Sequence, residues 1–124
     1  MEPTSPRILL AERNPNIRQF LFMQLMQEGI ASVMAATGYE ARKCLDQMQS
    51  LEVMVLDPEL PDVSVLYTPD QRYFTGSIRV ILFAFEDEFD PALQMFATAC
   101  VVKTEAPDAL VSAVTSVLTA SGRG

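Results

Sequence analysis

A short apolar run occurs five times along this chain of 124 residues, and helix signals fill most of the stretches between the runs. Runs with little polar alternation are typical of strands that are buried on both faces. Parallel strands need crossover connections, which are usually helices. The pattern therefore predicts an α/β domain with a doubly wound, five-stranded parallel sheet. The predicted strands are Ile8–Ala11, Ile30–Ala35, Val53–Leu56, Val80–Phe83 and Cys100–Val102.

Helix boundaries are marked clearly in three places. Asn14 and Pro15 mark the start of a helix whose apolar spacing continues to Gly29. Thr37 is the predicted N-cap of a second helix, and the last helix follows Pro107. The first two of these helices would supply crossovers between the parallel strands.

The segment from Pro58 to Gly76 has a weaker pattern, because three prolines in it each remove a backbone donor. We expect a helix there that is broken near Pro69, and a short helix that begins at Pro91. The domain should span residues 7–119, with disordered ends at residues 1–6 and 120–124.

The composition excludes several kinds of function. Without histidine, the chain cannot form a Ser-His-Asp triad, a His-ligated zinc site or a phosphohistidine. A net charge of −7 and the lack of a basic run argue against direct nucleic-acid binding. No signal peptide or membrane-spanning segment is recognisable, so we expect a cytoplasmic protein without a membrane partner. Cys44 and Cys100 lie in apolar segments and are predicted core thiols.

Charged residues follow three of the predicted strands. Glu12 and Arg13 follow the first strand, Asp57 follows the third, and Lys103 follows the fifth. The carboxyl ends of parallel strands meet at one edge of the sheet, where ligands of such folds bind. We therefore expect these four side chains to converge.

With these positions in place, the chain resembles the receiver domains of two-component response regulators. The matching segments are Arg7–Leu10 leading to Asn14–Arg18, Val55–Asp57 followed by Leu60–Asp62, and Val101–Lys103. The resemblance implies a flavodoxin-like fold with strand order 2-1-3-4-5. It also implies a role in phosphorelay signalling rather than in catalysis. The implied partner is a histidine kinase, a helical phosphotransfer bundle or a second copy of the chain.

The resemblance assigns roles to individual residues, and the sequence departs from several of them. Asp57 would be the phosphoacceptor, Lys103 would pair with the phosphoryl group, and an acidic pair after the first strand would help to bind Mg²⁺. Here the second member of that pair is Arg13. Ala84 replaces the hydroxyl residue expected at the end of the fourth strand, and Cys100 replaces the aromatic residue expected three positions before the lysine.

These departures change the charge of the acidic pocket. Three carboxylates and one lysine would give a normal receiver site a formal charge of −2, but Glu12, Asp57, Arg13 and Lys103 sum to zero. Because a guanidinium repels a metal ion and cannot bind it, we expect no resident cofactor. Only weak Mg²⁺ binding is expected, and only if Glu12, Asp57 and Glu59 act together.

The sequence leaves three functions open. In the first, the domain is a protein-interaction module that works without phosphorylation, with Asp57 paired to Arg13 or Lys103. In the second, it is a working phosphoreceiver in which Arg13 grips the phosphoryl oxygens in place of the metal. In the third, it is an unrelated flavodoxin-like binding domain.

The helix that begins at Pro15 carries a candidate partner surface. With about 100° between successive residues, the core face of this helix should hold Ile17, Phe20, Leu21 and Leu25. The opposite face then presents an uncharged arc made of Phe22, Met23 and Met26. An exposed apolar arc of this kind suits a helical partner or a homodimer.

Overall fold

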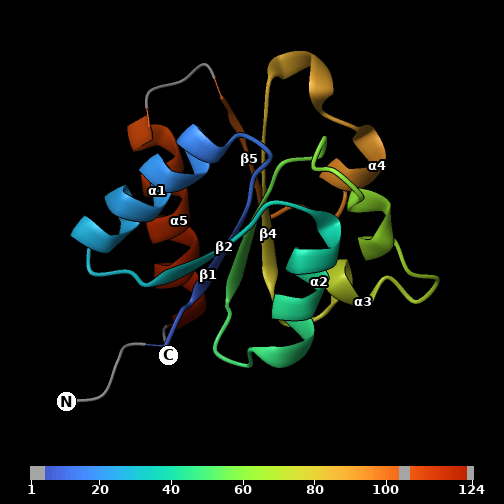
Figure 1. Cartoon of the computed structure of the whole chain (residues 1–124), viewed down its shortest axis with the longest axis horizontal. Coiled ribbons are helices and arrows are strands. Elements are labelled where there is room, and N and C mark those ends of the chain that lie inside the picture. The colour runs from blue at the N-terminus through green and yellow to red at the C-terminus, as the bar shows by residue number, and fades with distance from the viewer. Residues whose placement is uncertain (1–4, 104–106, 123–124) are drawn as a thin grey trace.

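The computed structural model describes residues 5–103 and 107–122. Helices and strands alternate along these residues, with two short 3-10 helices, labelled η, among them (Figure 1). In chain order the elements are β1 (Ile8–Ala11), α1 (Pro15–Gln27), β2 (Ser32–Ala35), α2 (Gly38–Gln47), β3 (Val53–Leu56), η1 (Val63–Leu66), α3 (Arg72–Thr75), β4 (Arg79–Ala84), η2 (Glu86–Glu88), α4 (Pro91–Gln94), β5 (Ala99–Val102) and α5 (Pro107–Gly122).

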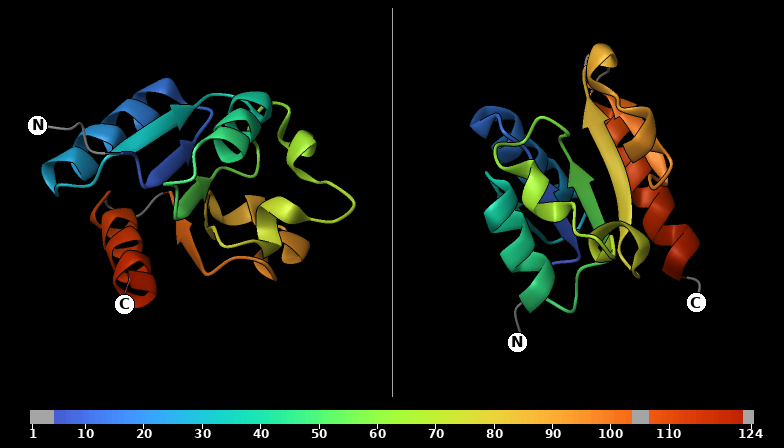
Figure 2. Two further views of the ribbon diagram at one scale, coloured as in Figure 1. Left: turned by 90° about the horizontal axis from the view of Figure 1, so that it is seen from below. Right: turned by 90° about the vertical axis from the view of Figure 1, so that its right-hand side faces the viewer.

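The five strands form one parallel sheet in the order β2-β1-β3-β4-β5, which confirms the predicted fold class and strand order. Helices α1 and α5 cover one face, and α2, α3 and α4 cover the other (Figures 1 and 2). The register brings the ends of the strands level. Ala11 pairs with Leu56, and Ala84 pairs with Val102. The residues that directly follow β1, β3 and β5 therefore meet at one edge.

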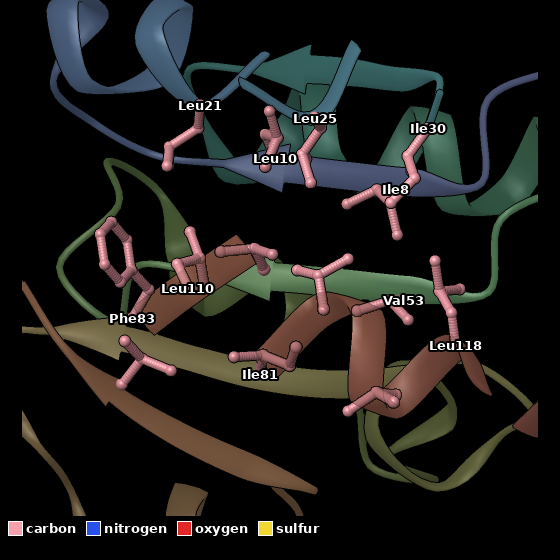
Figure 3. Close-up of a cluster of buried hydrophobic side chains, with 14 residues drawn as sticks. Ile8, Leu10, Leu21, Leu25, Ile30, Val53, Ile81, Phe83, Leu110 and Leu118 are labelled. Atoms are coloured by element: carbon pink, nitrogen blue, oxygen red, sulfur yellow. The ribbon is translucent and has the colours of Figure 1, made fainter. Parts of the chain in front are cut away.

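Alternate residues along the strands contribute their side chains to two separate hydrophobic cores. On the face covered by α1 and α5, Leu21 and Leu25 point towards β1, Leu110 lies near Phe83 of β4, and Leu118 lies near Val53 of β3 (Figure 3). The other face packs against α2, η1, α3 and α4 through Ala41, Leu66, Phe74 and Leu93. Strands β1 and β3 are buried at every position, which explains why their sequences lack polar residues.

The predicted caps hold the first two helices in place. The Asn14 side chain accepts hydrogen bonds from the backbone N–H groups of Asn16 and Ile17, at 2.8 and 3.1 Å. The Thr37 hydroxyl accepts one from the Glu40 N–H at 3.1 Å. These bonds satisfy N–H groups that have no partner within the helix.

The structure differs from the sequence predictions at several boundaries. Between residues 58 and 76 it has η1 and α3, each a single turn, instead of one broken helix. Helix α5 runs to Gly122, past residue 119 where a disordered tail was expected. At the other end, residues 1–4 lie outside the described residues, whereas the Pro6 carbonyl accepts a hydrogen bond from Ser50 at 2.6 Å.

One prediction about the cysteines is wrong. Cys44 is half-buried and packs against the α2-side core, but Cys100 is exposed. Cys100 pairs with Leu82 on the face that α2, α3 and α4 cover, yet β5 is the edge strand and α4 is only one turn long. The helix layer therefore ends before it reaches this thiol. No helix in the described ranges is long and apolar enough to cross a membrane.

Candidate functional site

Two buried carboxylates meet one buried ammonium at the carboxyl edge of the sheet. The side chains of Glu12, Asp57 and Lys103 are each no more than 1% exposed. The Lys103 Nζ lies 3.0 and 3.1 Å from the two carboxylate oxygens of Glu12, and 3.2 Å from Asp57 Oδ2. The structure thus brings together three residues that are far apart in the sequence and follow β1, β3 and β5.

Arg13 supplies a second cation to Asp57. Its Nε lies 3.1 Å from Asp57 Oδ2, and its backbone N–H donates to the same oxygen at 3.2 Å. The other oxygen, Oδ1, accepts a hydrogen bond from the Glu59 N–H at 2.9 Å. Lys103 and Arg13 together therefore surround one carboxylate oxygen, and the backbone of the following loop occupies the other.

The far end of the Arg13 side chain is held by a residue that the sequence analysis missed. Its Nη2 lies 2.7 Å from Glu88 Oε2, and the second oxygen of Glu88 accepts a hydrogen bond from the Phe85 N–H at 3.1 Å. Arg13 thus links the loop after β1 to η2, which follows β4. The acidic run Glu86–Glu88 at the end of an apolar strand was the signal available in the sequence.

Two aromatic rings flank the lysine, and these were also missed. The Lys103 Nζ lies 5.5 Å from the ring centroids of both Phe83 and Phe85, within the range of a cation–π contact. Phe85 directly follows the β4 residue Ala84, whose carbonyl accepts a hydrogen bond from the Lys103 N–H at 2.8 Å. The end of β4 therefore fixes both the backbone and the side chain of Lys103.

Burial and nearby positive charge shift the pKa values of the carboxylates of the site in opposite directions. Burial raises the pKa of Glu12, which the hydrogen bond from the Asn14 N–H and the ion pair with Lys103 oppose only in part. For Glu88, burial acts to raise the pKa, but the hydrogen bonds from Arg13 and the Phe85 N–H outweigh it and leave the pKa below its ordinary value.

The remaining predicted site residues take less direct positions. Ala84 is fully buried at the end of β4, and Cys100 faces solvent on β5. Glu59 contributes its backbone N–H to Asp57, whereas its side chain is exposed. Within residues 5–103 and 107–122, no group of three or more His, Cys, Asp or Glu side chains is placed to hold a metal ion.

The exposed apolar surface of α1 differs by one residue from the prediction. Met23 and Met26 are exposed, with 46% and 52% of their surface accessible, but Phe22 is half-buried against the core shared with α5. Phe20, which was assigned to the core, is 46% exposed instead. Because α5 packs beside α1, the buried face of α1 is turned towards Phe22. We call Phe20, Met23 and Met26 the α1 stripe.

Comparison with known proteins agrees on the fold. No protein-family model matches the sequence, and no curated protein matches it. Among solved structures, the response regulator TrrA of Thermotoga maritima, solved with Mg²⁺ and BeF, is 26% identical with a TM-score of 0.75, and the match covers 91% of this chain and 99% of TrrA. The chemotaxis response regulator CheY4 of Vibrio cholerae is 23% identical with a TM-score of 0.70, covering 93% and 100%.

A third match is longer than this chain. A redox sensor of the streptococci, described as evolved from two-component response regulators, is 19% identical with a TM-score of 0.80. The match covers 94% of this chain and 52% of the sensor, so this chain spans about half of that protein. Together the comparisons show that the chain has the receiver-domain fold of two-component response regulators.

Proposed function

We propose that this domain is a cytoplasmic signalling module that binds protein partners without accepting a phosphoryl group. The observation that carries the proposal is the surroundings of Asp57. Its Oδ2 lies within 3.2 Å of both the Lys103 ammonium and the Arg13 guanidinium, and its Oδ1 accepts the Glu59 N–H. A phosphoryl donor would have to displace these contacts before it could reach either oxygen.

The same contacts argue against a working magnesium site. A divalent cation at Asp57 would lie beside the fixed charge of Arg13, which cannot be deprotonated at any physiological pH. The Glu12 carboxylate is already paired with Lys103, and the exposed Glu59 side chain is not gathered with Glu12 and Asp57 into a metal-binding group. We therefore derive no step that uses Mg²⁺.

The response to phosphorylation would also lack its usual parts. In receivers, a hydroxyl at the end of the fourth strand and an aromatic residue on the fifth strand respond to the phosphoryl group. Here Ala84 has no hydroxyl, and the exposed Cys100 occupies the aromatic position. A phosphoryl group on Asp57 would therefore have no side chain at these positions to act on. The streptococcal match supports the idea that this fold serves outside phosphotransfer.

The α1 stripe is our candidate for the partner surface. Two methionines and a phenylalanine at a spacing of three residues form one exposed line on the outside of α1. A helix of a partner or of a second copy could pack against such a line. Methionine suits this task because its flexible side chain adapts to different partners.

The test is exposure of the protein to acetyl phosphate with and without Mg²⁺, followed by intact mass measurement. We expect no mass gain in either condition. The matched variant Arg13→Asp restores the acidic pair and should gain one phosphoryl group only with Mg²⁺. Arg13→Asp combined with Asp57→Asn is its control and should gain none.

A gain of one phosphoryl group by the unmodified protein, lost in Asp57→Asn, would refute the proposal. It would favour the alternative function of a working phosphoreceiver in which Arg13 takes the place of the metal. That alternative further requires that the gain be unaffected by removal of Mg²⁺ with a chelator.

A further inference from the structure

A cavity of about 380 Å³ opens between the loop of residues 67–71, α3 and α4, on the opposite face of the sheet from the α1 stripe. Its aromatic lining consists of Tyr67, Phe74 and Phe96. The ring centroids of Tyr67 and Phe74 lie 5.8 Å apart, and those of Phe74 and Phe96 lie 5.9 Å apart. The rings therefore form one continuous tilted cluster of the kind that small-molecule sites use.

The cavity lies beside two short helices. Helices α3 and α4 are each four residues long, and both lie at the right of the sheet in Figure 1. Phe74 and Leu93 are nearly buried and form the floor, whereas Tyr67 is 44% exposed at the mouth. A longer helix in either place would cover this cluster.

Among the described residues that line the cavity, Asp90 is the only charged one. Asp90 Oδ1 accepts the Ala92 N–H at 2.8 Å, which fixes the carboxylate at the start of α4. Burial raises the pKa of Tyr67, and the negative charges of Asp90 and Glu59 raise it further.

We propose that this cavity binds a small organic cation in which an ammonium group is joined to an aromatic or apolar group. The aromatic rings of Tyr67 and Phe96 carry quadrupoles that attract a cation, and Asp90 adds a full negative charge. The apolar floor would receive the uncharged part of the same molecule. An anion of equal size would meet only rings and a carboxylate, and it should be excluded.

This proposal is independent of the Asp57 site. The cavity lining includes none of Glu12, Arg13, Asp57 or Lys103. A volume of this size is at the lower end of the range for small-molecule pockets, which favours a free small molecule over a folded partner. Either proposal can therefore fail while the other stands.

The test is an NMR titration of the labelled protein with three matched compounds, namely 2-phenylethylammonium, 2-phenylethanol and phenylacetate. We expect the ammonium to shift the signals of Tyr67, Phe74 and Leu93 in a saturable way, with a Kd on the order of 1–10 mM for so small a ligand. The neutral alcohol should bind about fivefold more weakly, which corresponds to the upper end of the range for a partly exposed charge pair. The carboxylate should not bind.

Two variants locate the charge and the rings. Asp90→Asn keeps a side-chain oxygen for the Ala92 N–H but removes the charge, and should weaken ammonium binding about fivefold. Tyr67→Leu should weaken it by a similar factor. Glu28→Gln makes the same charge change at an exposed position after α1, on the other face of the sheet, and should leave the Kd unchanged.

Four results would overturn the proposal. These are the absence of any saturable shift, shifts centred outside the cavity, equal binding of the alcohol and the ammonium, and an unchanged Kd in Asp90→Asn. Tighter binding of N-acetyl-lysine amide than of 2-phenylethylammonium would also overturn it, because it would assign the cavity to a basic side chain of a protein partner.

Discussion

Replacing Lys103 with methionine should cost more stability than any other single loss of charge in the acidic pocket. Methionine keeps most of the aliphatic stem between the rings of Phe83 and Phe85 but removes the ammonium. Three contacts of 3.0–3.2 Å to Glu12 and Asp57 are lost, and all three side chains are at most 1% exposed. The variant leaves two buried carboxylates, of which Asp57 keeps its ion pair with Arg13 and Glu12 has no salt bridge left.

The magnitude follows from this burial. Removing one partner of a buried ion pair costs about 3–5 kcal/mol, because the remaining charge stays desolvated without compensation. A domain of this size has a total stability of about 5–15 kcal/mol, so the variant should fold but should be marginal. With a urea m-value of about 2 kcal/mol/M, the midpoint of unfolding should fall by about 2 M. Loss of Lys103 also removes a charge that lowers the pKa of Glu12, so that pKa should rise further.

The assay is equilibrium urea unfolding at pH 7, followed by circular dichroism. The matched control is Arg7→Met, which breaks an ion pair with Glu52 whose side chains are 41% and 37% exposed. That control should lose no more than about 1 kcal/mol. Adding Glu12→Gln to Lys103→Met should recover part of the loss, because it removes one of the stranded charges. A Lys103→Met midpoint equal to that of Arg7→Met would refute the reasoning.

Three further predictions use other features of the structure. Mg²⁺ should leave the thermal midpoint of the unmodified protein unchanged but should raise the midpoint of Arg13→Asp, as measured by differential scanning fluorimetry. Equal responses of the two proteins would contradict the role given to Arg13. Because the folded-state pKa of Glu12 is raised, the contribution of Glu12 to the free energy of unfolding is complete below about pH 4.5 and is lost as the pH rises through the raised pKa. Urea midpoints measured across this pH range should therefore fall less for Glu12→Gln than for the unmodified protein. Parallel curves for the two proteins would contradict this. Gly38→Ala should destabilise the protein by at least about 2 kcal/mol in urea unfolding, because the added Cβ would lie 1.9 Å from the Asp62 carbonyl oxygen. Gly29→Ala should cost only about 1 kcal/mol, because its added Cβ would meet no atom within 4 Å and only the φ of +77° is unfavourable.

Strands β1 and β3 were predicted to the residue, whereas the bounds of β2, β4 and β5 were not. Strands β1 and β3 are flanked by strands on both sides and covered by helices on both faces, so every position in them is apolar. At the edge of the sheet, β2 begins at Ser32 and not at Ile30. The Ile30 N–H donates to the Leu25 carbonyl at 2.9 Å, in the turn that ends α1 after Gly29. An apolar residue that closes a helix cannot be told from one that opens a strand by hydropathy alone.

The acidic pocket was predictable in its centre and not at its rim. Strand ends in a parallel sheet converge whatever the loops do, so Glu12, Asp57 and Lys103 could be placed together from the sequence. Glu88 reaches the pocket only because η2 folds back over the end of β4, and its contact with Arg13 depends on the conformation of a loop. Loop conformation leaves little trace in residue periodicity.

The face of α1 was mispredicted for a related reason. A helical wheel with one buried face assumes that the helix packs only on the sheet, whereas α1 also packs beside α5 (Figure 1). This second contact buries Phe22 in part and exposes Phe20. The strand order determines which helices are neighbours. A helical wheel drawn for one helix alone contains no information about the strand order.

The charge balance of the pocket and the distribution of exposed apolar groups both favour signalling through surfaces. Glu12, Asp57, Arg13 and Lys103 sum to zero, and Glu88 brings the set to −1, so a divalent cation would replace a nearly neutral pocket with a positive one. On this reasoning the pocket has one stable state, and signals would pass through surfaces. Helix α1, which carries the α1 stripe, and helix α4, beside which the cavity lies, are on opposite faces of the sheet (Figure 1). A protein partner on α1 therefore would not block a small cation, and the two could be bound at the same time.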